Sequence, residues 1–198
     1  MSALSELGRD ISVCQKCSTL ASTRTRVVPG NGPEDAEIMF IGEAPGKNED
    51  LQGLPFVGAA GSFLDELLEA INLNRKQVFV TNIIKCRPPQ NRDPLPAEID
   101  HCNPWLEDQI AQLRPRLIVT LGRYSMARFF PGRSIGKVHG TAQKNDGIIY
   151  FAMYHPAAAL HQQNLRQTII EDMRRIPPLL VQTGNVPEEQ EPRQLTMF

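Results

Sequence analysis

The chain has 198 residues and a formal net charge of −1, and the 41% of residues that are hydrophobic suit one ordinary globular domain. Its apolar runs fall short of the roughly 20 residues that a membrane span needs. The first residues lack the basic and apolar regions of a secretory signal. We therefore expect a cytoplasmic, monomeric protein with reduced thiols, and not a membrane protein or a disulfide-rich secreted one.

The basic residues are unevenly distributed along the chain. Glutamates outnumber basic residues from Gly184 onward, so the preceding part of the chain is more basic than the net charge suggests. Basic side chains in predicted loops and at predicted helix starts could neutralise phosphates, and an ordinary solvated surface is the alternative. These residues are Arg24, Arg26, Lys85, Arg87, Arg92, Arg123, Arg128, Arg133 and Lys137.

The first half of the chain predicts two strands that alternate with two helices. Residues 37–41 and 78–84 are apolar and rich in β-branched side chains, as buried strands are. Between them, residues 62–71 repeat apolar side chains with a helical period, and Ser62 is a suitable N-cap. A second helix is predicted over residues 96–113.

The second half continues this alternation. We predict strands at residues 117–121 and 148–153, a helix after Gly122, and a helix over residues 165–176 that the two following prolines end. Nearly continuous apolarity is typical of strands that are covered on both faces of a parallel sheet. The predicted fold is therefore α/β, a three-layer α/β/α sandwich around a four-stranded, mainly parallel sheet.

Unusual residues follow each predicted strand. Gly42–Gly46 follows the first strand, Asn82 lies near the end of the second, Gly122 follows the third and His155 the fourth. Because ligands of open α/β sheets bind beyond the carboxyl ends of the strands, we expect the functional site at this edge. Gly42–Gly46 lacks the spacing of a Walker loop or a dinucleotide fingerprint. A buried structural hydrogen bond is the alternative for Asn82, and a capping or core role is the alternative for His155.

The four cysteines indicate a metal site. Cys14 and Cys17 form a C-x-x-C pair, whereas Cys86 and Cys102 occur separately. Reducing conditions disfavour a disulfide, and a zinc ribbon would supply a second close pair. Four thiolates from dispersed loops suit either structural zinc or a four-iron cluster, and the spacing leaves both open.

Several short motifs occur in one order along the chain. They are Cys14–Cys17, Arg24–Val28, Gly42–Gly46, Pro55–Gly58, Thr81–Pro89 and His155–Pro156. Together they resemble the family-four uracil-DNA glycosylases, the iron–sulfur branch of the uracil-DNA glycosylase superfamily, and the resemblance runs from Cys14 to about Leu180. It implies an enzyme that flips uracil out of DNA and hydrolyses the N-glycosidic bond, leaving an abasic site for base excision repair. It also implies a [4Fe-4S] cluster on Cys14, Cys17, Cys86 and Cys102.

The same resemblance implies how uracil is held. Phe56 is the aromatic platform on which the base stacks, and Asn82 accepts from uracil N3–H while donating to O4. Backbone groups around Glu43 and Ala44 hold the carbonyls of the base. Bulk near C5 must exclude thymine, and Glu49 is the candidate for that role.

The resemblance also implies catalytic roles. His155 donates a hydrogen bond to the departing uracil anion, as an oxyanion hole does. The better-known branch of the superfamily has an aspartate at the position of Ala44, so orientation of the attacking water falls to Glu43 or Asn91. Leu160 could wedge into the gap left by the flipped base, with a core leucine as the alternative.

We expect residues 1–183 to form a single domain and residues 184–198 to form a flexible acidic tail. The segment Gln194–Phe198 resembles the pentapeptide by which bacterial repair proteins dock on the sliding clamp, and a meaningless apolar end is the alternative. Two other functions remain open from the sequence. One is a non-catalytic iron–sulfur module that binds damaged DNA, and the other is a glycosylase, zinc-stabilised, for another deaminated base.

Overall fold

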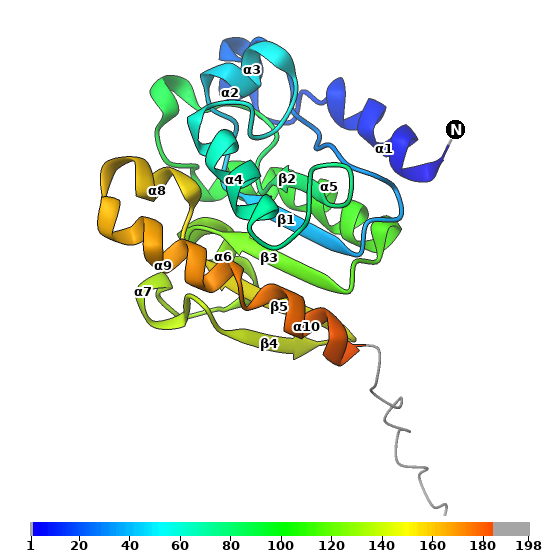
Figure 1. Ribbon diagram of the computed structural model, residues 1–198. Coiled ribbons are helices and arrows are strands. Elements are labelled where there is room, and N and C mark those ends of the chain that lie inside the picture. The colour runs from blue at the N-terminus through cyan, green and yellow to red at the C-terminus, as the bar shows by residue number, and fades with distance from the viewer. Residues whose placement is uncertain (1, 184–198) are drawn as a thin grey trace, which may run out of the picture.

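The computed structural model describes residues 2–183 and contains, within that range, a five-stranded sheet with helices on both faces (Figure 1). Neighbouring strands pair in parallel, except that the edge strand β4 pairs with β5 in the antiparallel direction. The strand order is β2 (Phe79–Asn82), β1 (Ile38–Gly42), β3 (Leu117–Leu121), β5 (Ile148–Met153) and β4 (Ala142–Asn145).

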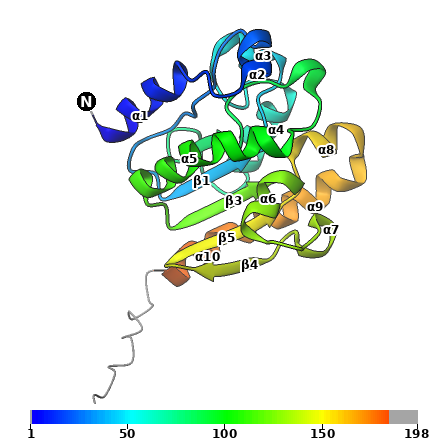
Figure 2. The same cartoon turned by 180° about the vertical axis from the view of Figure 1, so that it is seen from behind.

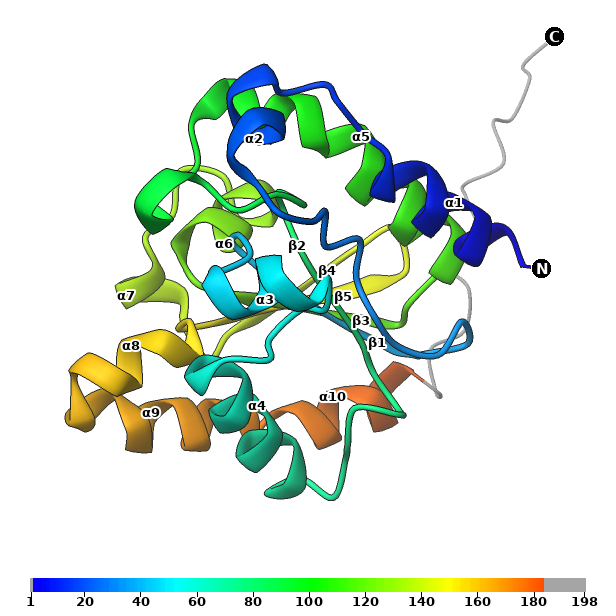
Figure 3. The same cartoon turned by 90° about the horizontal axis from the view of Figure 1, so that it is seen from above.

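Two groups of helices cover the sheet, as the view from above shows (Figure 3). One face carries α4 (Ala59–Glu69), α8 (Pro156–His161), α9 (Gln163–Met173) and α10 (Ile176–Thr183). The other face carries α1 (Ala3–Ser12), α5 (Pro96–Leu113), α6 (Arg123–Phe129) and α7 (Ile135–Val138), of which α1 and α5 lie in front of the sheet in Figure 2. The short helices α2 (Ser18–Thr23) and α3 (Lys47–Gln52) lie together at the top of Figure 1.

Strand β1 shows why both faces need cover. Phe40 packs with Phe63 and Leu67 of α4, whereas Met39 packs on the opposite face with Leu106 of α5. Every residue of β1 is buried. Alternate side chains of a strand point to opposite faces, so a strand that is apolar throughout is stable only between two layers. The predicted three-layer α/β/α sandwich is confirmed.

The predicted number of strands was one too low, because β4 was missed. Its sequence, Ala-Gln-Lys-Asn, is polar and all four residues are exposed. The strand lies at the edge of the sheet, where it pairs only with β5. A strand that buries no face has no apolar pattern that a sequence could display.

The predicted helices occur with shifted ends. The helix over 96–113 is confirmed at both ends, whereas α4 begins at Ala59, with Gly58 and not Ser62 as N-cap. The two prolines after Ile176 do not stop all helical structure, because α10 begins at Ile176 and holds both of them in its first turn. Proline is tolerated there, since the N–H groups of a first turn have no partner within the helix.

Residues 184–198, which include the predicted acidic tail and its clamp-binding end, lie outside the described residues. Within residues 2–183, no helix combines the length and the apolar character needed to cross a membrane.

Candidate active site

A cavity of about 350 Å³ lies beyond the carboxyl ends of the strands. Every residue predicted to bind the base or to act in catalysis lines it, at the edge of the sheet where ligands of such folds bind. These residues come from the exit of β1, from α3 and the loop that follows it, from the end of β2 and the short turn at residues 89–91, and from the N-cap of α8. They are Glu43, Ala44, Glu49, Phe56, Asn82, Asn91 and His155.

Asn82 presents an unpaired acceptor in this cavity. It is the last residue of β2 and is 1% exposed, and its Oδ1 atom is buried with no hydrogen-bond partner in the described structure. An unpaired buried amide oxygen costs about 1–3 kcal/mol, so this atom favours a ligand that brings an N–H group. The alternative role for Asn82 was a structural hydrogen bond, but its Oδ1 atom makes none with any group of residues 2–183.

Gly42 makes room for this arrangement. It is paired with Asn82 in the sheet, and a Cβ atom at Gly42 would lie 2.4 Å from Asn82 Oδ1 and 2.7 Å from Phe56 Cζ. Such distances are too short for non-bonded atoms. The recognition amide and the aromatic ring can therefore approach each other only because this position has no side chain.

Phe56 is held in an uncommon backbone conformation. Its φ is +52°, and its ring stacks on that of His155 with centroids 5.5 Å apart and an interplanar angle of 23°. Arg75 braces it from outside the cavity, because Nη2 donates to the Phe56 carbonyl (2.9 Å) while Nε pairs with Asp65 (2.5 Å). A Cβ on Gly61 would lie 1.8 Å from the same carbonyl oxygen. Neither Arg75 nor Gly61 could be predicted from the sequence, because only the fold brings them to Phe56.

His155 caps α8 and faces the cavity. Its Nδ1 atom accepts from the N–H of Ala157 (3.1 Å), which assigns the proton of the neutral ring to Nε2. Burial lowers the pKa of His155 to about 4, and the carboxylate of Glu49 opposes this shift. The ring is therefore neutral at neutral pH and has one N–H to donate. The capping role and the predicted ligand role are compatible.

Glu43 and Asn91, the two candidates for orienting water, both line the cavity. Glu43 Oε1 accepts from the N–H of Tyr124 at the start of α6 (3.3 Å). Burial raises the pKa of Glu43, and the hydrogen bond from Tyr124 and the charge of Arg123 oppose the shift. Asn91 has a φ of +56°, and its Oδ1 accepts from Arg87 Nε (2.7 Å).

Glu49 also lines the cavity, but its carboxylate oxygens bond to the main chain of the cavity wall. Oε1 accepts from the N–H groups of Val57 and Gly58 (2.9 Å each), and Oε2 accepts from Gly46 (3.1 Å). These bonds connect the start of α3 to the turn that carries Phe56. Its predicted role in excluding thymine stays a prediction.

Comparison with known proteins places this geometry in a family. A sequence model of the Uracil DNA glycosylase superfamily matches residues 29–174. A type-4 uracil-DNA glycosylase of Sulfurisphaera tokodaii is 47% identical over 191 residues, which cover 91% of this chain and 86% of the relative. The type-4 uracil-DNA glycosylase of Archaeoglobus fulgidus is 44% identical, over 89% of this chain and 92% of the relative. That of Thermotoga maritima is 37% identical, over 88% of this chain and 93% of the relative.

The chain belongs to the type-4 uracil-DNA glycosylases. The family resemblance found in the sequence is thereby confirmed, and so is the uracil-DNA glycosylase-like fold.

The four cysteines of this type-4 chain gather near the exit of β2. Cys86 and Cys102 are buried in one apolar cluster, and Cys17 packs against it. Burial raises the pKa of Cys17 to about 11 and that of Cys86 to about 12, and in both cases the nearby Cys102 and Cys14 raise it further. These charge effects place the four cysteines in one region of the structure.

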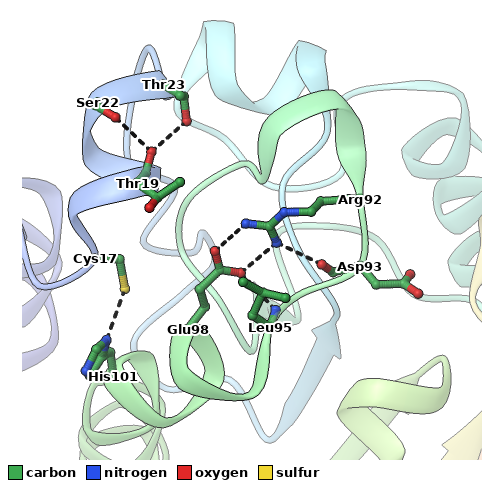
Figure 4. Close-up of polar contacts among 9 residues, drawn as sticks. All are labelled: Cys17, Thr19, Ser22, Thr23, Arg92, Asp93, Leu95, Glu98 and His101. Carbon is green, nitrogen blue, oxygen red and sulfur yellow. Dashed lines mark hydrogen bonds and ion pairs between the residues drawn. The ribbon is translucent and has the colours of Figure 1, made fainter.

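The surroundings of these thiols suit thiolate chemistry. Trp105 Nε1 donates to Cys14 Sγ and Arg24 Nη1 donates to Cys86 Sγ, both at 3.3 Å. Cys17 Sγ lies 3.7 Å from Nδ1 of His101 (Figure 4). Such donors stabilise negative charge on sulfur. Within residues 2–183, however, no three ligand-type side chains are arranged to hold a single metal ion.

The expectation that the basic residues could neutralise phosphates needs correction at Lys85. Lys85 is 1% exposed and lies inside the protein, so it cannot reach a phosphate. Arg92 makes a two-pronged ion pair with Glu98, and Arg123 pairs with Asp93 (Figure 4 shows the first pair). These guanidinium groups stabilise the loop between β2 and α5.

Leu160, the predicted DNA wedge, is on α8 outside the set of cavity-lining residues. Its side chain is 47% exposed, so it is not the core leucine that was the alternative.

Proposed function

We propose that this chain flips uracil out of DNA and hydrolyses its N-glycosidic bond, leaving an abasic site for base excision repair. The observation that carries the proposal is the buried, unpaired Oδ1 atom of Asn82 in a cavity at the carboxyl edge of the sheet. The type-4 relatives, which are named uracil-DNA glycosylases, support the same activity.

Asn82 supplies the choice of base. Uracil offers a donor at N3 and an acceptor at O4, so it can pair with the Oδ1 and the N–H₂ of one amide. Cytosine offers an acceptor at N3 and a donor at its exocyclic amine. Binding cytosine would leave the buried polar groups of Asn82 unpaired, and such mismatches discriminate by several kcal/mol at buried sites.

Phe56 binds the flipped base, and His155 assists its departure. Stacking on the Phe56 ring holds the flipped base, and the Nε2–H of the neutral His155 donates to the uracil oxygen on which negative charge develops. A neutral donor is suited to an anionic leaving group, because it stabilises the anion without transferring a proton.

Orientation of the attacking water belongs to Glu43 or Asn91. Both residues line the cavity, and Glu43 is the one that can carry a negative charge opposite the developing positive charge on the sugar. We therefore favour Glu43 for this role.

We also propose that Cys14, Cys17, Cys86 and Cys102 hold a [4Fe-4S] cluster. A tetrahedral zinc ion needs four sulfurs at about 2.3 Å from one centre, and the described residues do not form such a set. In a four-iron cluster each thiolate binds a different iron, so the sulfurs stand farther apart. The cluster supplies a structural link between the N-terminal segment and the exit of β2.

Two contacts with macromolecules complete the proposal. Leu160, exposed on the helix that His155 caps, fills the space left by the flipped base in duplex DNA. The segment Gln194–Phe198 docks on the bacterial sliding clamp.

The experiment that tests the activity and the cofactor uses the purified wild type and Asn82→Ala with an oligonucleotide that contains one uracil. We expect a brown wild type that releases free uracil. Asn82→Ala should keep the colour and release uracil about 10²–10³-fold more slowly, because it loses both hydrogen bonds to the base. Visible absorbance and single-turnover release are the two measurements.

Each proposal has its own contrary result. A wild type that binds the oligonucleotide but releases nothing would favour a damage-binding module. Faster release of hypoxanthine than of uracil would favour another deaminated base. A colourless protein that contains zinc would contradict the proposed cluster but not the proposed glycosylase activity.

A further inference from the structure

Lys85 is a buried lysine that the proposed function does not yet use. It lies three residues after Asn82 and just before Cys86, and 1% of its surface is exposed. Lysine is almost never fully buried unless it is paired, because removing an ammonium group from water is costly. Its partners inside the protein therefore indicate what it does.

The Lys85 ammonium donates three hydrogen bonds. Nζ lies 2.8 Å from Thr81 Oγ1, 2.7 Å from the carbonyl oxygen of Asn82 and 2.7 Å from Gln109 Oε1. An ammonium group has three donors and no acceptor, so these bonds use its full capacity. One of the three partners is the main chain of the recognition residue.

The other two partners are themselves held from behind. Thr81 Oγ1 and Gln109 Nε2 both donate to the carbonyl oxygen of Pro29, at 2.9 and 2.8 Å. Thr81 and Gln109 are buried, so water does not substitute for these bonds. In a buried network of this kind, loss of one member leaves several polar groups unpaired.

The main chain of Lys85 is also anchored. Its carbonyl oxygen accepts from the N–H of Val28 (2.7 Å), and the next residue along the chain is Cys86. The residue therefore lies between the cysteine region and the recognition amide. Its ammonium is the part that contacts Asn82.

We propose that Lys85 is a positioning residue for base recognition: its ammonium holds the main chain of Asn82 so that the side-chain amide meets the base in the correct direction. A displacement of about 1 Å in a recognition group can cost roughly 10²-fold in rate. Asn82 Oδ1 has no protein partner in the described structure to direct it, so its main chain is the part that must be fixed. This inference rests on the proposed function.

The test is a double-mutant cycle with Lys85→Met, Asn82→Ala and the double variant. Methionine fills a similar volume without the three donors, and Lys76→Met, at an exposed lysine, is the matched control. We expect Lys85→Met to release uracil about 10–100-fold more slowly in a single turnover. In the Asn82→Ala background the same change should cost less than about threefold, because it acts through the amide that is already lost.

Visible absorbance of each holoprotein shows whether the cysteine site is intact. Should Lys85→Met fail to fold, Gln109→Met removes one acceptor and leaves Lys85 in place. We expect that variant to be about 3–10-fold slower, again with no further loss on Asn82→Ala.

An equal loss in both backgrounds would overturn the inference, because Lys85 would then act on the protein in general. Wild-type rates for both Lys85→Met and Gln109→Met would also overturn it. These results differ from failure of the proposed function, in which the wild type itself releases no uracil.

Discussion

Two titratable residues of the cavity have their pKa values shifted by the same cause, with different consequences. Burial lowers the pKa of His155 to about 4 and raises that of Glu43, because it disfavours the charged form of each group. His155 is therefore neutral above about pH 5, whereas Glu43 becomes protonated at a pH at which an ordinary glutamate is still charged. The same burial thus favours the neutral form of both groups.

The shift of Glu43 predicts the acid limb of the pH–rate profile. A carboxylate that orients water must be ionised, so the rate of uracil release should fall as pH falls through the raised pKa of Glu43. Glu43→Gln should abolish this limb and slow release by about 10²–10⁴-fold, the usual contribution of such a group. Single-turnover rates between pH 5 and 8 measure both effects.

Asn91→Ala is the matched variant for this prediction. It should retain the acid limb, since its amide does not titrate. If Asn91→Ala causes the larger loss and Glu43→Gln keeps the limb, the water is oriented by Asn91.

The sequence pointed to residues that line the cavity but not to those that support them. Asn82 and His155 stood out because each is a polar side chain at or just beyond the end of an apolar strand, which is a local signal. Arg75 reaches Phe56 from 19 positions away, and Gln109 reaches Lys85 from 24 positions away. Lys85 was taken for a phosphate ligand, because its charge is visible in the sequence and its burial is not.

The short helix α8 and its N-cap carry two of the proposed functional residues. His155 caps its first turn and faces the cavity, and Leu160 lies near its end with 47% of its surface exposed. The helix packs on α4 and α9, which belong to the rigid core. The proposed wedge and the proposed leaving-group donor are therefore held at a constant separation.

This arrangement predicts that Leu160→Ala affects duplex DNA selectively. A wedge stabilises the gap that a flipped base leaves in a stacked duplex, and single-stranded DNA has no such gap to fill. We expect a roughly tenfold lower kcat/KM on a double-stranded uracil substrate and a change below about twofold on a single strand. Val181→Ala, at a residue 71% exposed on α10, is the control. Equal losses on both substrates would argue against a wedge.

Elements with an apolar face were predictable, and elements without one were not. The helix over 96–113 was placed correctly, because proline at its first position and a run of apolar side chains mark it. Strand β4 and the short helices α2, α3 and α7 bury few side chains of their own. Their positions depend on contacts between distant segments, such as the buried Asp50 of α3, which accepts from the N–H groups of Thr25 and Arg26.

At the scale of the whole molecule, the parallel sheet collects the site. Strands β2, β1, β3 and β5 are neighbours that point the same way, so their carboxyl ends bring residues as distant in the sequence as Glu43 and His155 to one edge. The order of the strands could not be read from the sequence, because β1, β2, β3 and β5 are all short, largely apolar and almost fully buried. The motifs at the strand ends predicted the position of the site even though the strand order was unknown.

Docking of Gln194–Phe198 on a sliding clamp would bring the whole chain to DNA. Removing Gln194–Phe198 should abolish binding to the purified bacterial sliding clamp and leave uracil release from a short oligonucleotide within about twofold. A version with the same five residues in scrambled order is the control, and surface plasmon resonance is a suitable measurement. Unchanged clamp affinity after the deletion would contradict the proposed binding of this segment to the clamp.

Gly42 also limits how the specificity of this enzyme can be redesigned. A side chain at this position would have to displace the recognition amide or the stacking ring, since its Cβ would lie within 3 Å of both. Laboratory evolution toward a larger or differently substituted base therefore has no route through the floor of the cavity. Variation is available on the side formed by Ala44, Pro45 and Ala60, where small side chains already line the wall and can be exchanged without moving a strand.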